Sequence, residues 1–147
     1  MAQSKAHSHK GHAHVWADDL TPNQALVLGI LAHADAPLSA YDILDRLRDD
    51  GLRAPLQVYR ALEKLTERGL AHRLESLNAF VCCADTRRHA TGILGFAICE
   101  ACGRVEEFAE PQVESRLRAW GKASGFVSSR TMIELRGLCR QCASRSS

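Results

Sequence analysis

The chain has 147 residues, of which 46% are hydrophobic and 24% charged, and its formal net charge is +2. This composition excludes a wholly disordered chain, a collagen-like repeat and a disulfide mini-protein. Because no apolar run approaches a membrane helix and no secretory signal is recognisable, we expect a cytoplasmic protein without a membrane partner. Thiols stay reduced there, so the six cysteines and seven histidines favour metal ligands over disulfides. With so small a net charge, any affinity for nucleic acid must come from local charge.

The N-terminal segment is polar and rich in histidine. It shows no apolar period and cannot build a core, so we predict a disordered tail over residues 1–17. Its histidines would suit weak, exchangeable metal capture: His7, His9, His12 and His14.

The first predicted helix begins at Pro22. Thr21 suits its N-cap, and Gln24 stands where a capping box needs it. The helix is expected to end near His33, before Pro37. Apolar residues that recur at helical spacing are predicted to face the core: Ala25, Leu28, Leu31 and Ala32.

The second predicted helix begins after Ser39, with Asp42 at the capping-box position. Gly51 follows its last turn, where a left-handed residue is favoured. Its predicted apolar stripe comprises Tyr41, Ile43, Leu44 and Leu47.

The third predicted helix runs from about Pro55 to Arg68, with Val58, Leu62 and Leu65 facing inward. Two strands follow, over residues 70–76 and 79–83, joined by a tight turn at Leu77 and Asn78. Three helices and a hairpin follow the order of a winged helix-turn-helix. We therefore predict a DNA-binding domain over residues 18–84.

The third helix carries the candidate DNA contacts. Base edges are reached by side chains such as Arg and Gln, while other polar groups hold phosphates. Arg60 is favoured for a base-edge or phosphate contact, with Tyr59 beside it. The full candidate set is Arg53, Gln57, Tyr59, Arg60, Lys64 and Arg68. The alternative is that these residues form an ordinary solvated helix face. The order of three helices followed by a hairpin argues against this alternative.

The second half begins after a polar linker predicted over residues 85–92. We expect a strand over residues 93–98 broken by Gly95, and another over residues 104–108. A helix begins at Pro111 and is closed by Gly125, and a long alternating strand covers residues 126–135. The residues that share one face of this helix are Val113, Leu117 and Trp120.

The fold class is thus α+β, with an N-terminal winged helix-turn-helix domain and a small C-terminal α/β dimerisation domain. The second domain spans residues 93–147. So small a domain buries little core by itself. It needs a metal ion, a partner subunit or both.

Two Cys-x-x-Cys pairs are the most specific pattern in the chain. Cys99 and Cys102, with Cys139 and Cys142, supply four sulfurs, enough for a closed tetrahedral zinc site. Such a site would bring the last strand back against the first strand of this domain. Redox chemistry is the alternative, but it normally needs one pair in a thioredoxin-like context that is absent here.

A closed four-thiolate site has no open position, so metal sensing would need a second, weaker site. Mixed nitrogen, sulfur and oxygen ligands suit zinc. Beside the tail histidines, the candidates are His72, Cys82, Cys83, His89, Glu106 and Glu107. Each also has an ordinary explanation, as a surface histidine or a small apolar cysteine.

Five motifs along the chain are similar to those of a known protein family: Ser39-Ala40-Tyr41-Asp42-Ile43-Leu44, Val58-Tyr59-Arg60-Ala61-Leu62, Gly69-Leu70, Ile98-Cys99-x-x-Cys102-Gly103-x-Val105-x-Glu107-Phe108 and Cys139-x-x-Cys142. With these motifs the chain resembles the ferric uptake regulator family. The resemblance extends from about Leu20 to Cys142 and implies a homodimeric, metal-dependent repressor of double-stranded, pseudo-palindromic operator DNA, without a small-molecule substrate.

Within that family the chain is most similar to zinc uptake regulators. The iron and peroxide branches usually carry a histidine-rich run before the first cysteine pair, and residues 91–98 contain no histidine. The resemblance implies two Zn²⁺ sites per subunit and repression of zinc-uptake genes. The implied regulatory ligands are His72, Cys83, His89 and Glu107, with Cys82 and Glu106 as adjacent alternatives.

Two rival functions have to be weighed against this one. In the first, the zinc is only structural, and another metal or thiol oxidation at Cys82 or Cys83 is the trigger. The second is a zinc hydrolase or deaminase, which needs an open zinc position and a nearby Glu. The His-x-Glu and Pro-Cys-x-x-Cys pattern of deaminases is absent around His89 and Cys99, so we expect no enzyme.

Overall fold

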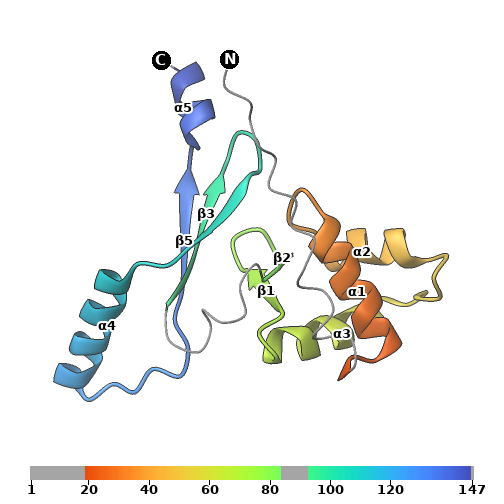
Figure 1. Ribbon diagram of the computed structural model, residues 1–147, viewed down its shortest axis with the longest axis horizontal. Helices are drawn as coiled ribbons and strands as arrows, with labels where there is room; N and C mark the ends of the chain where they lie inside the picture. Colours follow the sequence, from red (N-terminus) through yellow and green to blue (C-terminus); the bar gives the residue numbers. More distant parts are fainter. Residues whose placement is uncertain (1–18, 84–92, 147) are drawn as a thin grey trace, which may run out of the picture.

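A computed structural model describes residues 19–83 and 93–146 and shows a helical half, a β-hairpin and a three-stranded sheet (Figure 1). The predicted tail over residues 1–17 and the predicted linker over residues 85–92 lie outside the described residues. The helices are α1 Pro22–His33, α2 Ala40–Leu47, α3 Pro55–Glu67, α4 Pro111–Ser124 and α5 Arg140–Arg145. The strands are β1 Ala71–Leu74, β2 Ala79–Cys82, β3 Leu94–Cys99, β4 Val105–Phe108 and β5 Met132–Gly137.

The first two helices begin with the predicted capping boxes. The Thr21 hydroxyl accepts the Gln24 N–H at 3.3 Å, and the Gln24 carbonyl oxygen accepts the Thr21 N–H at 3.2 Å. At α2, the Asp42 carboxylate accepts the N–H of Ser39 at 2.9 Å and its hydroxyl at 2.6 Å. These bonds occupy N–H groups that a helix leaves without an internal partner, so both helix starts are fixed locally.

The helical half encloses one apolar core. The largest fully buried side chains in it are Val27, Ile43, Leu47, Leu52, Val58, Leu62 and Leu65. The inward positions predicted for α3 are confirmed. Tyr41, predicted to be in the core, is 63% exposed, because α2 buries Ala40 instead. In α1 the buried residues are Val27 and Leu31, while Ala25 and Ala32 are exposed.

The hairpin β1–β2 is shorter than predicted. Its antiparallel strands pair Ala71 with Cys82 and Leu74 with Ala79, and residues 75–78 form the turn. Leu38 extends the pairing: it donates its N–H to Phe80 at 3.1 Å and accepts the Phe80 N–H at 2.8 Å. The hairpin is thereby bonded to the helical core as the wing of a winged helix.

The C-terminal sheet has the strand order β4-β3-β5. β3 is antiparallel to β4 and parallel to β5, so the last strand returns against the first as predicted. Gly95 does not break β3, contrary to the prediction. A Cβ there would overlap the Phe108 ring, so the glycine instead admits this ring across the sheet.

Helix α4 projects away from the sheet (Figure 1). Gly125 closes it, as predicted, and adopts the left-handed conformation, and Phe126 turns back so that its ring centroid lies 5.7 Å from that of Trp120. The strand predicted over residues 126–135 is wrong in its first part: β5 begins only at Met132, and Val127 is 92% exposed. The turn after Gly125 uses these residues before the chain reaches the sheet.

Helix α5 was not predicted, and it follows Cys139 directly. With six residues it is too short to show an apolar period. No helix within the described ranges is long and apolar enough to cross a membrane.

The two halves meet where the wing lies against the sheet. Leu74 of β1 packs with Leu94, Phe96 and Ile98 of β3 in a small buried cluster, which we call the seam. Val81 and Val105 cover its edge. The apolar face of β3 is thus buried by the wing.

Candidate metal centre and nucleic-acid interface

The four cysteines meet at one end of the C-terminal sheet. Cys99 ends β3 and Cys139 follows β5, and because these strands are parallel their chains leave the sheet at the same edge. The four Sγ atoms all lie within 4.8 Å of one another, with Cys102 and Cys139 separated by 3.9 Å. The predicted pairing of the two motifs is therefore present in the structure.

Each Cys-x-x-Cys turn is held by backbone hydrogen bonds. In the first turn, Gly103 adopts a φ of 73° and donates its N–H to the Cys99 carbonyl at 2.9 Å. In the second, Ala143 donates to the Cys139 carbonyl at 2.8 Å, and the chain continues as α5. A helical continuation needs no left-handed residue, which explains why alanine suffices there.

The electrostatics of this cluster suit a bound cation. The N–H groups of Cys139 and then Cys102 lower the pKa of Cys99 to about 6. A hydrogen bond with the Cys139 thiol, followed by burial, raises the pKa of Cys142 to about 12. Four adjacent sulfurs cannot all ionise without a counter-charge, and a divalent cation would supply it. Four sulfur donors fit a closed tetrahedral zinc site, with no position left for a substrate.

Of the four predicted regulatory ligands, His72 and Glu107 border the seam. The His72 side chain is 4% exposed, and its ring centroid is 5.7 Å from that of Phe96. Phe96 pairs in register with Glu107 of β4, and Cys83 follows β2 with 9% exposure. His72 and Cys83 therefore come from the wing and Glu107 from the sheet.

The adjacent alternatives differ in their surroundings. Burial and then the charge of Glu107 raise the pKa of the Cys82 thiol, so Cys82 also lies near this carboxylate. Glu106 is exposed on β4. His89 lies outside the described residues. Across residues 19–83 and 93–146, the four cysteines form the one group of three or more such side chains placed to share a metal ion.

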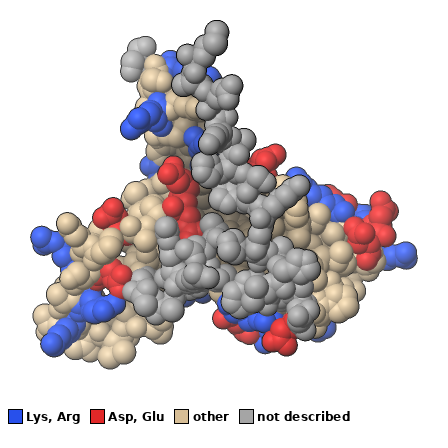
Figure 2. Space-filling model, viewed as in Figure 1, with Lys and Arg blue, Asp and Glu red and all other residues tan. Residues whose placement is uncertain are grey.

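The predicted DNA contacts on and near the outer face of α3 fall into two groups: exposed side chains, and side chains that are bonded within the protein. Arg53 and Arg60 are exposed, and neither side chain is bonded to another described residue. Tyr59 is 43% exposed beside them. Basic and acidic side chains lie next to one another over the helical half in Figure 2. These three side chains are the ones the described structure leaves available to a ligand.

The other three candidates are already bonded within the protein. The Gln57 side-chain oxygen accepts the N–H groups of Arg53 and Ala54 at 2.9 and 3.1 Å, so it caps α3. Lys64 is 2.9 Å from Glu67.

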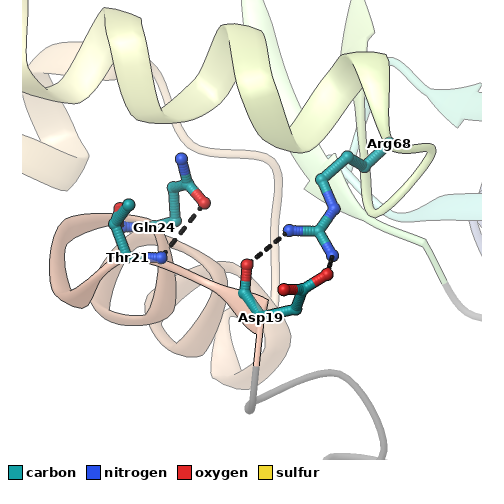
Figure 3. A network of polar contacts seen from close by, with 4 residues as sticks. All are labelled: Asp19, Thr21, Gln24 and Arg68. Carbon is teal, nitrogen blue, oxygen red and sulfur yellow. Dashed lines mark hydrogen bonds and ion pairs between the residues drawn. The ribbon is translucent and has the colours of Figure 1, made fainter.

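Arg68 closes the α3 end of the domain. It donates to the Asp19 carbonyl at 2.9 Å and lies 3.5 Å from its carboxylate, which ties the end of α3 to the start of α1 (Figure 3). A role in holding the domain together thus competes with the predicted DNA contact of Arg68.

Two apolar side chains on the helical half are exposed although the sequence did not predict it: Leu56 was not singled out, and Tyr41 was predicted to face the core. Leu56 is 57% exposed in the first turn of α3, and Tyr41 is 63% exposed in the first turn of α2. The sequence does indicate that Leu56 is exposed, because it lies outside the helical face formed by Val58, Leu62 and Leu65.

A hollow of about 1030 Å³ lies between α4 and the end of α3. Leu117, Trp120 and Phe126 line one side of it, and Thr66 and His72 line another. The apolar face of α4 opens into this space, since Leu117 and Trp120 remain 42% and 59% exposed.

Comparison with known proteins gives related regulators over most of the chain. A family model described as "Ferric uptake regulator family" matches residues 19–136. The zinc uptake regulation protein of Escherichia coli (strain K12) is 38% identical over 126 residues, which are 84% of this chain and 72% of that protein.

Two solved structures are similar over most of their length. A zinc uptake regulator complexed with zinc and DNA is 37% identical, with a TM-score of 0.80 over 86% of this chain and 85% of that chain. A holo form of XcZur is 42% identical, with a TM-score of 0.77 over 85% and 86%. The matched residues include the wing, α3 and the first cysteine pair, and the chain belongs to the ferric uptake regulator family.

Proposed function

We propose that this protein is a zinc-responsive transcriptional repressor, whose homodimer binds pseudo-palindromic operator DNA and represses zinc-uptake genes. The observation that carries the proposal is the seam, where candidate ligands from the wing and from the sheet lie on either side of one contact. A metal site at that place links DNA binding to metal supply. The relatives named for zinc uptake, and the one solved with zinc and DNA, support this choice of metal and partner.

The proposal assigns different roles to two zinc sites. Cys99, Cys102, Cys139 and Cys142 would hold a structural ion, since four sulfurs close the coordination shell. The regulatory ligands would be His72, Cys83, His89 and Glu107. When bound there, zinc would join the wing, the linker and the sheet and so favour one arrangement of the two halves. A hundredfold rise in DNA affinity requires about 2.7 kcal/mol of such preference.

The domains divide the work. Residues 18–84 would bind DNA, residues 85–92 would form the hinge, and residues 93–147 would dimerise. The exposed apolar face of α4 supports dimerisation in this part of the chain, because a second copy would bury it. Two-fold symmetry then presents one α3 to each half-site. We place this action in the cytoplasm, where the thiols stay reduced.

The direct test is DNA binding against buffered free Zn²⁺, with Fe²⁺ and Mn²⁺ in parallel. The probe is a palindromic, AT-rich duplex selected with the wild-type protein. We expect steep activation by zinc alone. His89→Ala should need at least about tenfold more free zinc, as when support of a metal site is lost. His33→Ala is the matched control, because His33 is an exposed residue at the end of α1.

Each other outcome has a definite meaning. Binding that ignores zinc would leave the cysteine site structural and return thiol oxidation to consideration. Activation by Fe²⁺ would assign the chain to another branch of the family.

The DNA surface has its own test. If Arg60 reads a base, Arg60→Ala should cost about 1–3 kcal/mol on the selected duplex and little on random DNA. Arg145→Ala, an exposed change in α5, is the charge-matched control. An equal loss on both kinds of DNA would make Arg60 a phosphate contact.

A further inference from the structure

One carboxylate bonds the tip of the wing to the C-terminal sheet. Glu134 lies in β5, and its two oxygens accept the backbone N–H groups of Glu75 and Ser76 at 2.6 and 3.2 Å. Both donors belong to the turn at residues 75–78 between β1 and β2. This contact therefore crosses from the helical half to the C-terminal half.

The sheet register places Glu134 beside the seam. Glu134 pairs with Phe96 of β3, whose ring lies against His72. Paired residues on neighbouring strands project to the same face of a sheet, so Glu134 and Phe96 both face the wing. The polar contact and the apolar seam thus hold the same hairpin from two adjacent points.

The two contacts constrain the wing differently. Apolar contact is non-directional and allows side chains to slide. Two N–H groups on a single carboxylate fix both its distance and its direction. The donors are backbone groups, so no change of rotamer at Glu75 or Ser76 can release them. The carboxylate therefore sets the position of the turn, and the seam supplies the apolar attraction between the wing and the sheet.

The carboxylate is charged under ordinary conditions. Burial alone would raise the pKa of Glu134, but hydrogen bonds with Ser76 and Glu75 and the charge of Arg136 hold it below its usual value. Hydrogen bonds to a charged acceptor are stronger than those to a neutral one. Arg73 lies 3.7 Å from the Glu75 carboxylate, so the side chain of Glu75 is engaged away from Glu134.

We propose that Glu134 is a positioning residue, which fixes the wing and the attached α3 relative to the dimerising sheet. The wing follows α3 after Gly69 and Leu70, so the two move together. In a homodimer the angle between wing and sheet sets the distance between the two α3 helices. Glu134 would thereby select the half-site spacing of the operator. This inference rests on the proposed function.

The test compares operators that differ only in spacing. Full-length dimer at saturating free Zn²⁺ is titrated with the selected palindrome and with duplexes whose half-sites are one base pair closer or farther. Glu134→Ala and Glu134→Gln should each bind the selected spacing about tenfold more weakly, as expected for a lost charge-assisted contact, and the other spacings almost unchanged. Gln fails because its amide hydrogens would face one of the N–H donors.

The controls separate positioning from general damage. Glu110→Gln makes the same chemical change at an exposed carboxylate without a capping bond, and should keep the wild-type spacing profile. An unchanged profile in the Glu134 variants would overturn the proposal. So would a loss of equal size at every spacing, because a merely structural residue would act in that way.

A spectroscopic readout tests the contact itself. The amide protons of Glu75 and Ser76 should resonate downfield in the wild type and move upfield in both Glu134 variants. Resonances that stay in place would overturn the proposal, whatever the DNA result. Wild-type protein that fails to bind DNA with zinc would contradict the proposed function, which is a distinguishable failure.

Discussion

The two halves of the molecule bury their apolar residues in different ways. In the helical half, Val27, Ile43 and Leu65 are fully inaccessible within one continuous core. In the C-terminal half, α4 leaves Leu117 and Trp120 largely exposed, and the buried cluster of the sheet includes Leu74 from the wing. The first half is held by its own packing, whereas the second shares its buried cluster with the wing and leaves one apolar helix face uncovered.

Removal of the metal ion from the cysteine cluster is expected to have the largest effect. Structural zinc contributes roughly 10 kcal/mol or more to folding, so Cys102→Ser or a strong chelator should abolish the order of β3 and β5. Hydrogen exchange should show these strands unprotected while α1–α3 stay protected. Cys82→Ser is the matched control, since Cys82 lies outside the cluster. Protected strands after metal loss would show that the second half also folds by packing alone.

The next largest effects are expected when one leucine in each half is truncated to alanine, and they should differ between the two halves. Leu65→Ala removes a fully buried side chain and should lower the free energy of unfolding of the helical half by about 2–5 kcal/mol. Leu117→Ala should leave the free energy of unfolding of the helical half unchanged. It should weaken dimerisation by about tenfold, as at an interface contact. Urea unfolding and sedimentation equilibrium measure the two effects. Equal destabilisation of the monomer by both changes would remove the contrast.

Substitution of a glycine in the C-terminal sheet is expected to have a smaller effect. Gly95→Ala places a methyl group against the Phe108 ring and should destabilise the β3–β4 pairing by about 1–3 kcal/mol. Hydrogen exchange of β4 measures the loss. Gly137→Ala is the control, because nothing lies within 4 Å of its added Cβ. If both substitutions behave alike, steric contact with Phe108 is not the cause.

The smallest effect is at the start of α2. Ser39→Ala should lower the free energy of unfolding by about 1 kcal/mol, as for other N-caps. Hydrogen bonds from Ser39 lower the pKa of Asp42, so their contribution is present above the unfolded value near 4 and fades as pH falls through the lowered pKa.

The pH dependence of this cap has its own control. The cost of Ser39→Ala, measured by urea unfolding, should therefore be larger at pH 7 than at pH 3. Thr21→Ala should cost about the same at both, since its partner Gln24 does not titrate. A cost of Ser39→Ala that is independent of pH would exclude the carboxylate from the cap.

Local signals were enough to predict some features. The caps at Thr21 and Ser39, the end of α4 at Gly125 and the four-cysteine cluster each depend on residues close in sequence or on a specific spacing. Tyr41 shows the limit, because a short helix offers neighbouring faces and only the packing of α2 decides that Ala40 goes inside.

Features that depend on distant partners were not predictable. The sequence predicted one shared face for α4, but not that this face would stay exposed in a single chain. Glu134 reads as an ordinary polar residue of an alternating strand, and its contact with Glu75 and Ser76 exists only once the wing meets the sheet.

The cap at the start of α3 limits what its first turn can offer to a base pair. The Gln57 oxygen is shared by two backbone N–H groups, so only its amide hydrogens remain for a ligand. Leu56 adds an apolar surface that suits a thymine methyl group. This turn can therefore donate to the N7 of guanine or adenine, to guanine O6 or to thymine O4, and it has no side-chain acceptor for the amino groups of cytosine and adenine.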